Sequence, residues 1–397
     1  MYSRKRLSPV VILDITYSGY GLMRSLHPYK IPMYGFTYSE KHFEVKTRLA
    51  KEIIIYQSTE TDLKEKLILL ATRLTARPIL MLTNDEKVEF VSQHLEELKA
   101  YYIINIPPKA LTAKLIDKIK LKSLIDKLHI NSPKTINIES QVDIKKVKEL
   151  QFPVILKPFL KSEKWYTAGF SKAIIFETLE ELEAIFPKLY AAENRIIVQE
   201  FIPGGDDAVY YCLVYYDNNG VCKTHFTGQK IRQWGILKGS TTSTKPIIDA
   251  YVTEETLRIF NAINYKGFGS IEFKKHDISG EYYMIEPTVG RIDTQEYIAT
   301  CAGNNIPLIA YCDMTGNPIV GKEKPNANVV FFDEVNELLS FIEYNKNHGL
   351  TVKKWLHSVK GKKHYRYLMS KDFGISLKIA FFLTRRLLGH FIRQLFK

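Results

Sequence analysis

Short apolar runs alternate with helix-like segments over the first hundred residues, and this alternation constrains the fold more than any other feature. The runs read as buried strands, and they lie at 9–15, 31–38, 52–57 and 77–84. Segment 85–102 has helical spacing, with Asn84 or Asp85 as its N-cap. Strands that are separated by such helices pair in parallel, because the chain must cross over between them. The sequence therefore predicts an N-terminal wound parallel sheet, an α/β arrangement.

The pattern changes after about residue 115. Short strand-like runs with hairpin-like separators follow, including DNNG at 217–220 and DISGE at 277–281. We expect an α+β region dominated by antiparallel strands up to about residue 320. Another α/β-like piece and a basic stretch come after it.

The charge of this chain is concentrated at its C-terminal end. The chain has 397 residues, a size that suggests two or three domains, and a formal net charge of +13. Segment 351–397 holds twelve Lys and Arg against Asp372, so about +11 of that charge lies there. The other composition values are those of an ordinary globular protein.

The cysteines and the N-terminal residues indicate the cellular compartment of the protein. Four cysteines without a CxxC pair or metal-like spacing favour reduced thiols and a cytoplasmic protein. The basic start MYSRKR is followed by an apolar stretch that is too short for a signal peptide. No run of 18 or more uncharged apolar residues predicts a membrane-spanning helix.

The sequence SGYG, residues 18–21, follows the first strand and opens a helix. A dinucleotide-binding fingerprint would need a third glycine where Arg24 stands. A tight strand-to-helix turn that faces the substrate is the preferred interpretation, and a dinucleotide oxidoreductase is the weaker one.

Two glutamates suggest a metal site. Glu272 and Glu286 follow apolar residues on two consecutive strands of a predicted hairpin, so they can be cross-strand neighbours on one face. Neighbouring carboxylates repel each other unless a cation lies between them, and Mg²⁺ prefers such oxygen ligands. The alternative is a pair of edge-strand glutamates that reach solvent.

Several cations fit a phosphate site. Lys157 ends an apolar run between two prolines, which suits an ammonium that is aimed at a phosphate. Lys230 and Arg232 are two residues apart on a strand and should therefore share one face. Lys118 stands at a helix start. Each of these alone is more often a solvated side chain than a ligand.

Taken in order, these residues resemble the ATP-grasp superfamily, in particular its carboxylate-amine ligase-like branch related to carbamoyl-phosphate synthase and biotin carboxylase. The resemblance covers roughly residues 10–320. It is carried by DK at 117–118, FPVILKP at 152–158, VQEFIPGGDD at 198–207, FTGQKIRQ at 226–233, GFGSIEFK at 267–274 and MIEPTVGR at 284–291.

The resemblance implies a domain plan. Residues 1–112 would form the wound pre-ATP-grasp domain, and residues 113–320 a two-subdomain ATP-grasp fold with antiparallel sheets. The lid subdomain would span 113–197 and the metal-binding, catalytic subdomain 198–320. Residues 321–397 would form an extension that ends in a basic amphipathic helix.

The resemblance also implies roles for individual residues. The residues that contact ATP would be Lys118, Lys157, Gln199, Glu200, Phe201, Ile202 and Asp206 or Asp207. The metal, Mg²⁺ or Mn²⁺, would be held by Glu272, Glu286 and Thr288. The catalytic cations would be Lys230, Arg232 and Arg291.

Two stretches depart from the pattern of the superfamily. Thr288 and Gly290 stand where an Asn and an Arg are usual, and Arg291 comes one position later. The lid loop 159–172 carries lysines and aromatics in place of several glycines. Its lysines either cover the triphosphate or are exposed on a mobile loop.

The final segment mixes apolar residues with cations. On a helix, Lys378, Arg385, Arg386, Arg393 and Lys397 form a narrow basic stripe beside a broad apolar face. This pattern is typical of a helix that lies on an anionic membrane surface. The alternative is a helix that packs on the protein body. Nucleic acid is disfavoured, because the aromatics lie within the apolar face.

These features predict an ATP-dependent carboxylate-amine ligase that forms an amide through an acyl-phosphate and releases ADP and phosphate. Its acid and amine would be small molecules or lipid- or sugar-linked cell-envelope precursors, and its location the cytoplasm or the inner membrane face. The alternative is a non-catalytic ATP-binding module that is recruited to a membrane or complex. Oligomeric state stays open.

Overall fold

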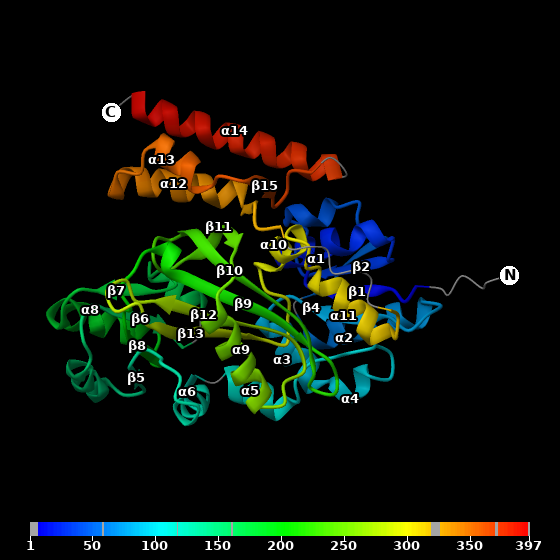
Figure 1. Cartoon of the computed structure of the whole chain (residues 1–397), viewed down its shortest axis with the longest axis horizontal. Helices are drawn as coiled ribbons and strands as arrows, with labels where there is room; N and C mark the ends of the chain where they lie inside the picture. Colours follow the sequence, from blue (N-terminus) through cyan, green and yellow to red (C-terminus); the bar gives the residue numbers. More distant parts are fainter. Residues whose placement is uncertain are drawn as a thin grey trace.

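Three sheets organise the described part of the chain (Figure 1). The computed structural model describes residues 7–57, 59–116, 118–159, 162–318, 326–369 and 372–395, and the side chains of 116–119 and 386–395 lie outside that description. None of the four cysteines forms a disulfide.

The N-terminal sheet is parallel, as predicted, with the order β3-β2-β1-β4. Its strands are β1 (Val10–Leu13), β2 (Met33–Thr37), β3 (Glu52–Ile55) and β4 (Ile79–Leu82). The helices are α1 (Tyr17–Leu26), α2 (Glu60–Arg73), α3 (Asp85–Gln93) and α4 (Leu95–Leu98). Asn84 caps α3 by accepting a hydrogen bond from the backbone N–H of Lys87 (2.9 Å).

The turn into α1 explains the first glycine of SGYG. A Cβ at Gly19 would lie 2.4 Å from the carbonyl oxygen of Asp14, so a side chain cannot be accommodated there. Glycine thus lets α1 begin immediately beside the end of β1. The tight strand-to-helix turn that the sequence predicts is present.

The second sheet is antiparallel, with the order β5-β8-β6-β7. Its strands are β5 (Thr135–Ile138), β6 (Val154–Pro158), β7 (Ile174–Phe176) and β8 (Ile196–Glu200). The helices α5 (Lys109–Ile116) and α6 (Lys118–Lys127) precede it, and α7 (Glu163–Thr167) and α8 (Leu179–Ala192) are inserted between its strands. Its core includes the fully buried Trp165 from the predicted lid loop, which packs against Phe170.

The largest sheet has the order β13-β12-β9-β10-β11-β14-β15. Its strands are β9 (Val209–Tyr216), β10 (Cys222–Trp234), β11 (Ser240–Pro246), β12 (Gly267–Lys275), β13 (Tyr282–Val289), β14 (Val329–Phe332) and β15 (Lys362–Tyr365). The pairs β9–β10 and β12–β13 are antiparallel hairpins, which confirms the turns predicted at 217–220 and 277–281. The helices that follow its strands are α9 (Ala250–Ala262), α10 (Glu296–Cys301) and α11 (Ile306–Thr315).

The C-terminal extension continues this sheet. Strand β14 pairs with β11, and β15 pairs in parallel with β14. The helices of the extension are α12 (Glu334–His348), α13 (Val352–Ser358) and α14 (Phe373–Leu395), which lie together along one side of the molecule, at the top of Figure 1. The extension therefore shares main-chain hydrogen bonds with the body and is not a separate appendage.

Helix α14 packs on the protein along one face. Ile375 and Ile379 are fully buried in the core that also contains the N-terminal sheet, and the rings of Phe43 and Phe382 lie 6.0 Å apart. The side chains of Lys378 and Arg385 are exposed, whereas those of Arg386, Arg393 and Lys397 lie outside the described residues. Within the described ranges, no helix combines the length and apolarity needed to cross a bilayer.

Candidate functional site

A cleft of about 400 Å³ lies between the second sheet and the largest sheet. Most of the residues that the sequence nominates line it, namely Lys157, Gln199, Glu200, Phe201, Ile202, Lys230, Glu272, Glu286, Thr288 and Arg291. They come from β6, from β8 and the segment after it, from β10 and β12, and from β13 and the turn after it. Segments far apart in the sequence thus meet around one cavity.

The two predicted metal carboxylates are directly opposed. Glu272 on β12 pairs in register with Glu286 on β13, which confirms the cross-strand prediction. Lys230 Nζ lies 2.8 Å from Glu272 Oε1 and 2.9 Å from Oε2. Gln295 Nε2 donates to Glu272 Oε1 at 2.9 Å. Glu272 is therefore held in one orientation at the cleft wall.

Asp293 is an acid in this site that the sequence analysis missed. It accepts hydrogen bonds through Oδ2 from Ser270 Oγ (2.7 Å) and Thr288 Oγ1 (3.0 Å). Thr288 therefore presents its hydroxyl group to a carboxylate beside the glutamate pair. The only sequence signal for Asp293 was its position, two residues after the segment MIEPTVGR, whose Gly290 has a left-handed backbone conformation.

The donor chemistry suits a hard divalent ion. Among the described residues, no group of three His, Cys, Asp or Glu is arranged to hold a metal unaided. Glu272 and Glu286 supply only carboxylate oxygens, so an ion here would complete its shell with phosphate oxygens and water. That is the usual coordination of Mg²⁺ at a nucleotide.

Lys274 is a second residue of this cleft whose part in the site the sequence analysis missed. It lines the cleft while 5% exposed, and its Nζ lies 3.9 Å from the ring centroid of Phe201. Burial lowers the pKa of Lys274 to about 8, with the neighbouring cations Lys157 and Lys230 contributing in the same direction. Lys157, Lys230 and Lys274 thus line the same cleft as Glu272 and Glu286, and their ammonium groups are suited to the phosphates of a bound polyanion.

Residues from the predicted nucleotide linker and the predicted lid loop line the other wall. Glu200 Oε1 accepts a hydrogen bond from the backbone N–H of Gln151 (2.9 Å), while Gln199 Nε2 donates to Thr135 Oγ1 (3.0 Å). From the lid loop, Lys172 lines the cleft and Lys164 is exposed. Asp117 and the side chain of Lys118 lie outside the described residues, as does Lys161.

Arg232 and Lys230 do not share a face, and that part of the sequence interpretation was wrong. The register of β10 against β11 shifts between these two residues, as in a β-bulge, which changes the alternation of side chains. Arg232 points to the C-terminal extension, where its Nε donates to Glu337 Oε1 of α12 (2.5 Å) and its Nη1 to Ser358 Oγ of α13 (2.6 Å).

Asp206 also lies outside the residues that line the cleft. Its carboxylate accepts hydrogen bonds from the backbone N–H groups of Gln233 (2.7 Å) and Leu237 (2.8 Å) and from Tyr344 Oη (2.6 Å). It therefore joins the end of β10 to α12. Asp207 is exposed beside it.

Arg291 links two parts of the molecule at the mouth of the cleft. Its Nε donates to Asp85 Oδ1 at 2.5 Å, at the start of α3. The guanidinium group of Arg291 therefore lines the cleft and also holds it to α3 of the N-terminal domain.

Comparison with known proteins agrees with this geometry. No family model matches the chain. The chain is 25% identical to D-aspartate ligase of Enterococcus faecium over 283 aligned residues. This alignment covers 68% of the chain and 63% of the relative. The chain is 28% identical over 156 residues to the N-terminal section of the carbamoyl phosphate synthase large chain of Methanopyrus kandleri, covering 36% and 26%. The chain thus spans less than two thirds of either relative.

Solved structures match over more of the chain. A biotin carboxylase complex with β,γ-ATP from Campylobacter jejuni superposes with a TM-score of 0.63 at 16% identity, covering 82% of this chain and 74% of that one. N5-carboxyaminoimidazole synthetase from Staphylococcus aureus gives 0.63 at 16% identity, covering 88% and 89%. Together with the sequence relatives, these matches show that this chain has the ATP-grasp fold of the carboxylate-amine ligase-like branch.

Proposed function

We propose that this chain is an ATP-dependent carboxylate-amine ligase. The observation that carries the proposal is the opposition of Glu272 and Glu286 in a cleft that also holds Lys157, Lys230 and Lys274. Charge neutralisation and positioning dominate phosphoryl transfer, so such a site needs no side-chain nucleophile. The sequence relative that is named as a D-aspartate ligase supports the same reaction class.

The proposed reaction has two steps. A carboxylate oxygen of the acid attacks the γ-phosphorus of ATP, the bond to the β,γ-bridging oxygen breaks, and acyl-phosphate and ADP form. The amine nitrogen then attacks the acyl carbon, phosphate leaves, and the nitrogen loses a proton as the amide forms. In both steps negative charge develops on oxygens, those of ADP in the first and those of the departing phosphate in the second, and the lysines of this cleft would offset that charge.

The chain's own residues have distinct roles in this scheme. Lys157, Lys230 and Lys274 bind the phosphates and offset the charge that develops on them. Glu272 and Glu286 would hold Mg²⁺ or Mn²⁺, which supplies Lewis-acid polarisation of the phosphate oxygens. Gln295 and Lys230 orient Glu272, and Arg291 remains beside the transferring group. Residues 199–202 contact the adenine edge, and the lid around 159–172 excludes water.

The test is acid-dependent turnover. Purified full-length chain, Mg-ATP and hydroxylamine are incubated with a panel of acids that includes D-aspartate, and hydroxamate and ADP are measured. Because hydroxylamine traps an acyl-phosphate without the natural amine, we expect equal yields of both products with the correct acid. Nucleotide binding without turnover for any acid or amine would instead support a non-catalytic ATP-binding module.

We further propose that the ligase works at a membrane surface on a lipid- or sugar-linked cell-envelope precursor. On α14, Phe373, Leu377 and Phe381 are 67%, 58% and 65% exposed, and their spacing of four residues aligns them on one face. Large aligned apolar side chains near exposed Lys378 and Arg385 suit an anionic bilayer surface.

Vesicle sedimentation tests this placement. The triple change of Phe373, Leu377 and Phe381 to Ser should release the protein from vesicles that contain anionic lipid. The Phe382→Leu variant is the control, since Phe382 packs on Phe43. Equal sedimentation of the triple variant and the unmodified protein would refute the membrane proposal.

A further inference from the structure

A continuous series of hydrogen bonds joins the C-terminal extension to the proposed metal site. It starts at Tyr344 on α12, whose Oη donates to Asp206 Oδ2 at 2.6 Å. Gln233, near the end of β10, donates through Nε2 to Asp206 Oδ1 at 3.0 Å. The Oε1 of Gln233 accepts from Lys230 Nζ at 3.2 Å, and Lys230 in turn contacts both carboxylate oxygens of Glu272. Each member touches the next, so a helix of the extension is connected to a carboxylate in the cleft.

The middle of this series is buried. Asp206, Lys230 and Gln233 are 3%, 4% and 4% exposed. Water therefore does not replace a partner that is lost, and a buried polar group without its partner is costly. A change at one member is thus expected to reach the next one.

The direction of these hydrogen bonds is fixed by the groups that make them. The carboxylate of Asp206 only accepts, and the ammonium group of Lys230 only donates. The amide of Gln233 lies between them, so its Nε2 faces Asp206 and its Oε1 faces Lys230. Gln233 therefore presents an acceptor to Lys230 in a single orientation.

Tyr344 completes the set of donors around Asp206. Oδ1 accepts from Gln233 Nε2 and from the backbone N–H of Leu237, and Oδ2 accepts from the backbone N–H of Gln233 and from Tyr344. Burial raises the pKa of Tyr344 above its ordinary value, and the charge of Asp206 acts in the same direction. The phenol therefore keeps its proton at neutral pH and donates it to this carboxylate.

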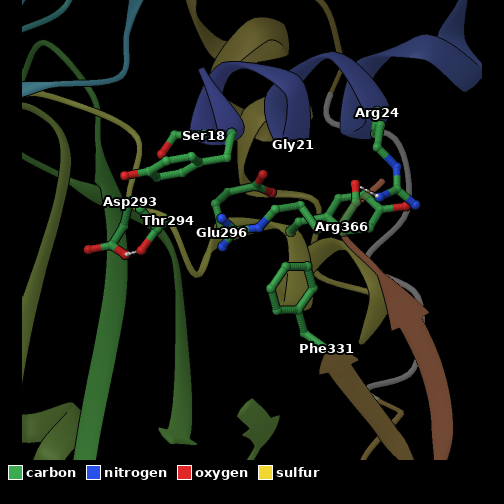
Figure 2. Close-up of a pocket in the computed structure, with 10 residues that line it drawn as sticks. Ser18, Gly21, Arg24, Asp293, Thr294, Glu296, Phe331 and Arg366 are labelled. Carbon is green, nitrogen blue, oxygen red and sulfur yellow. Dashed lines mark hydrogen bonds between the residues drawn. The ribbon is translucent and has the colours of Figure 1, made fainter. Parts of the chain in front are cut away.

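Helix α12 is itself held firmly at its start. Asp333 accepts a hydrogen bond from the backbone N–H of Asn336 (3.2 Å) and pairs with Arg366 Nη1 (3.1 Å). Arg24 on α1 donates through Nη1 to the backbone carbonyl oxygen of Arg366 at 2.5 Å, a hydrogen bond that Figure 2 shows. The extension is thus tied to α1 near the start of α12 and to the end of β10 through Tyr344.

The hydrogen bond to Gln233 differs from the other contacts of Lys230. Both oxygens of Glu272 would also serve the proposed metal ion. The Oε1 of Gln233 is not among those oxygens, so this bond is compatible with a bound metal. Gln233 is therefore suited to hold Lys230 Nζ in place while Glu272 binds the ion.

We infer that the C-terminal extension positions Lys230 for phosphoryl transfer. The positioning residues are Tyr344, Asp206 and Gln233, which act in that order. The inference rests on the proposed function for the role of Lys230. Because phosphoryl transfer depends on where charges are placed, a displaced ammonium group lowers the rate more than the affinity for ATP, which the other two lysines of the cleft still support.

Kinetics on the full-length chain tests this inference with two variants. Gln233→Leu removes the direct acceptor of Lys230, and Tyr344→Phe removes only a hydroxyl group at the far end of the series. In the hydroxamate assay, Gln233→Leu should lower kcat by about 10–100-fold, and Tyr344→Phe should lower it by about threefold. The KM for ATP should change little in both.

Two matched controls lose similar hydrogen bonds elsewhere. Gln229, also on β10, donates through Nε2 to the backbone carbonyl oxygen of Asp207 at 2.7 Å. Tyr282 Oη donates to Asp249 Oδ2 at 2.5 Å. Neither residue is among those that line the cleft. Gln229→Leu and Tyr282→Phe should therefore leave kcat unchanged.

A double-mutant cycle separates positioning from a general loss of structure. In the Lys230→Met background, Gln233→Leu should cause no further loss of kcat, since its effect passes through Lys230. Urea midpoints report any loss of stability separately. An unchanged kcat in Tyr344→Phe would overturn the inference, and so would a loss by Gln233→Leu that is the same with and without Lys230.

Nitrogen NMR of the lysine side chains gives a readout that does not depend on turnover. The ammonium signal of Lys230, assigned by its loss in Lys230→Met, should shift in Gln233→Leu and in Tyr344→Phe but not in Tyr282→Phe. If these shifts occur and no acid gives turnover, the proposed function fails and the positioning of Lys230 stands. If turnover occurs and the two variants change neither the signal nor kcat, the inference fails and the proposed function stands.

Discussion

The two sides of β10 use the same chemistry for opposite purposes. Lys230 contacts Glu272 on the cleft side, and Arg232 contacts Glu337 on the side of the C-terminal extension. The side chain of Glu272 is 20% exposed and faces the cavity, whereas that of Glu337 is 0% exposed. The difference shows that the burial of the partner, and not the type of the basic residue, decides whether the pair can also meet a ligand or only holds two elements of the core together.

The largest expected effect is on the sealed side. Arg232→Met leaves Glu337 buried with hydrogen bonds from Thr242 and Trp355 and no cation, which should cost about 3–5 kcal/mol of unfolding free energy. Urea denaturation measures this loss. Adding Glu337→Leu should recover much of it, because removing both charges leaves no unpaired ion. A single variant as stable as the unmodified chain would mean that the pair does not anchor the extension.

On the open side, Lys230→Met should lower turnover by about 10²–10³-fold, since it removes a cation that faces the transferring phosphate. Its urea midpoint should change little, because Glu272 keeps Gln295 and can reach solvent in the cleft. Rates come from the hydroxamate assay. Near-normal turnover with a strongly reduced midpoint would reverse the assignment of the two sides.

A change at Asp293 tests whether the segment MIEPTVGR, which departs from the superfamily pattern at Thr288 and Gly290, still supports metal binding. Asp293→Asn should weaken Mn²⁺ binding in the presence of the ATP analogue by about 10–100-fold, the range seen when a residue that orients metal ligands is changed. Electron paramagnetic resonance of free Mn²⁺ reports this affinity. Asp313→Asn, at a residue that accepts a hydrogen bond from Tyr215 away from the cleft, is the control. If both variants bind Mn²⁺ as tightly as the unmodified chain, Asp293 has no part in the metal site.

The smallest effect concerns Lys274. Its pKa of about 8 in the nucleotide-free protein is lowered first by burial, and bound phosphates should raise it. Nucleotide binding should therefore take up a proton above pH 8, and affinity should fall by up to about tenfold per pH unit there, while below pH 7 it should not change through this group. Titration calorimetry in two buffers of different ionisation enthalpy measures the uptake. In Lys274→Arg the uptake should vanish, and its persistence would assign the proton to another group.

Sequence reasoning recovered the cleft better than its surroundings. Lys157, Glu272 and Glu286 could be nominated because each follows an apolar run, where a charged side chain needs a reason, and Lys230 because FTGQKIRQ is one of the segments that carry the resemblance. Asp293 and Lys274 were missed, since neither position is unusual in a linear pattern. Arg232 was misread because alternation assumes a regular strand, and a register shift is not visible in residue types.

The contact between Arg24 and the C-terminal extension could not have been predicted in this way. Arg24 is on α1 and Arg366 follows β15, and only the pairing of β14 with β11 brings the extension against the N-terminal helix. Helix α14 shows the same limit of prediction from sequence. Its amphipathic pattern was readable, but only the packing of Ile375 and Ile379 shows which apolar side chains are left exposed.

The sequence by itself determined the class of each sheet, the hairpins and the opposed glutamates, because side-chain periodicity and turn residues act over a few neighbouring positions. The tertiary structure alone decided which charges face a cavity and which are sealed. Burial depends on elements that are distant in the chain, and burial decides whether a charged group binds a ligand or a neighbouring side chain.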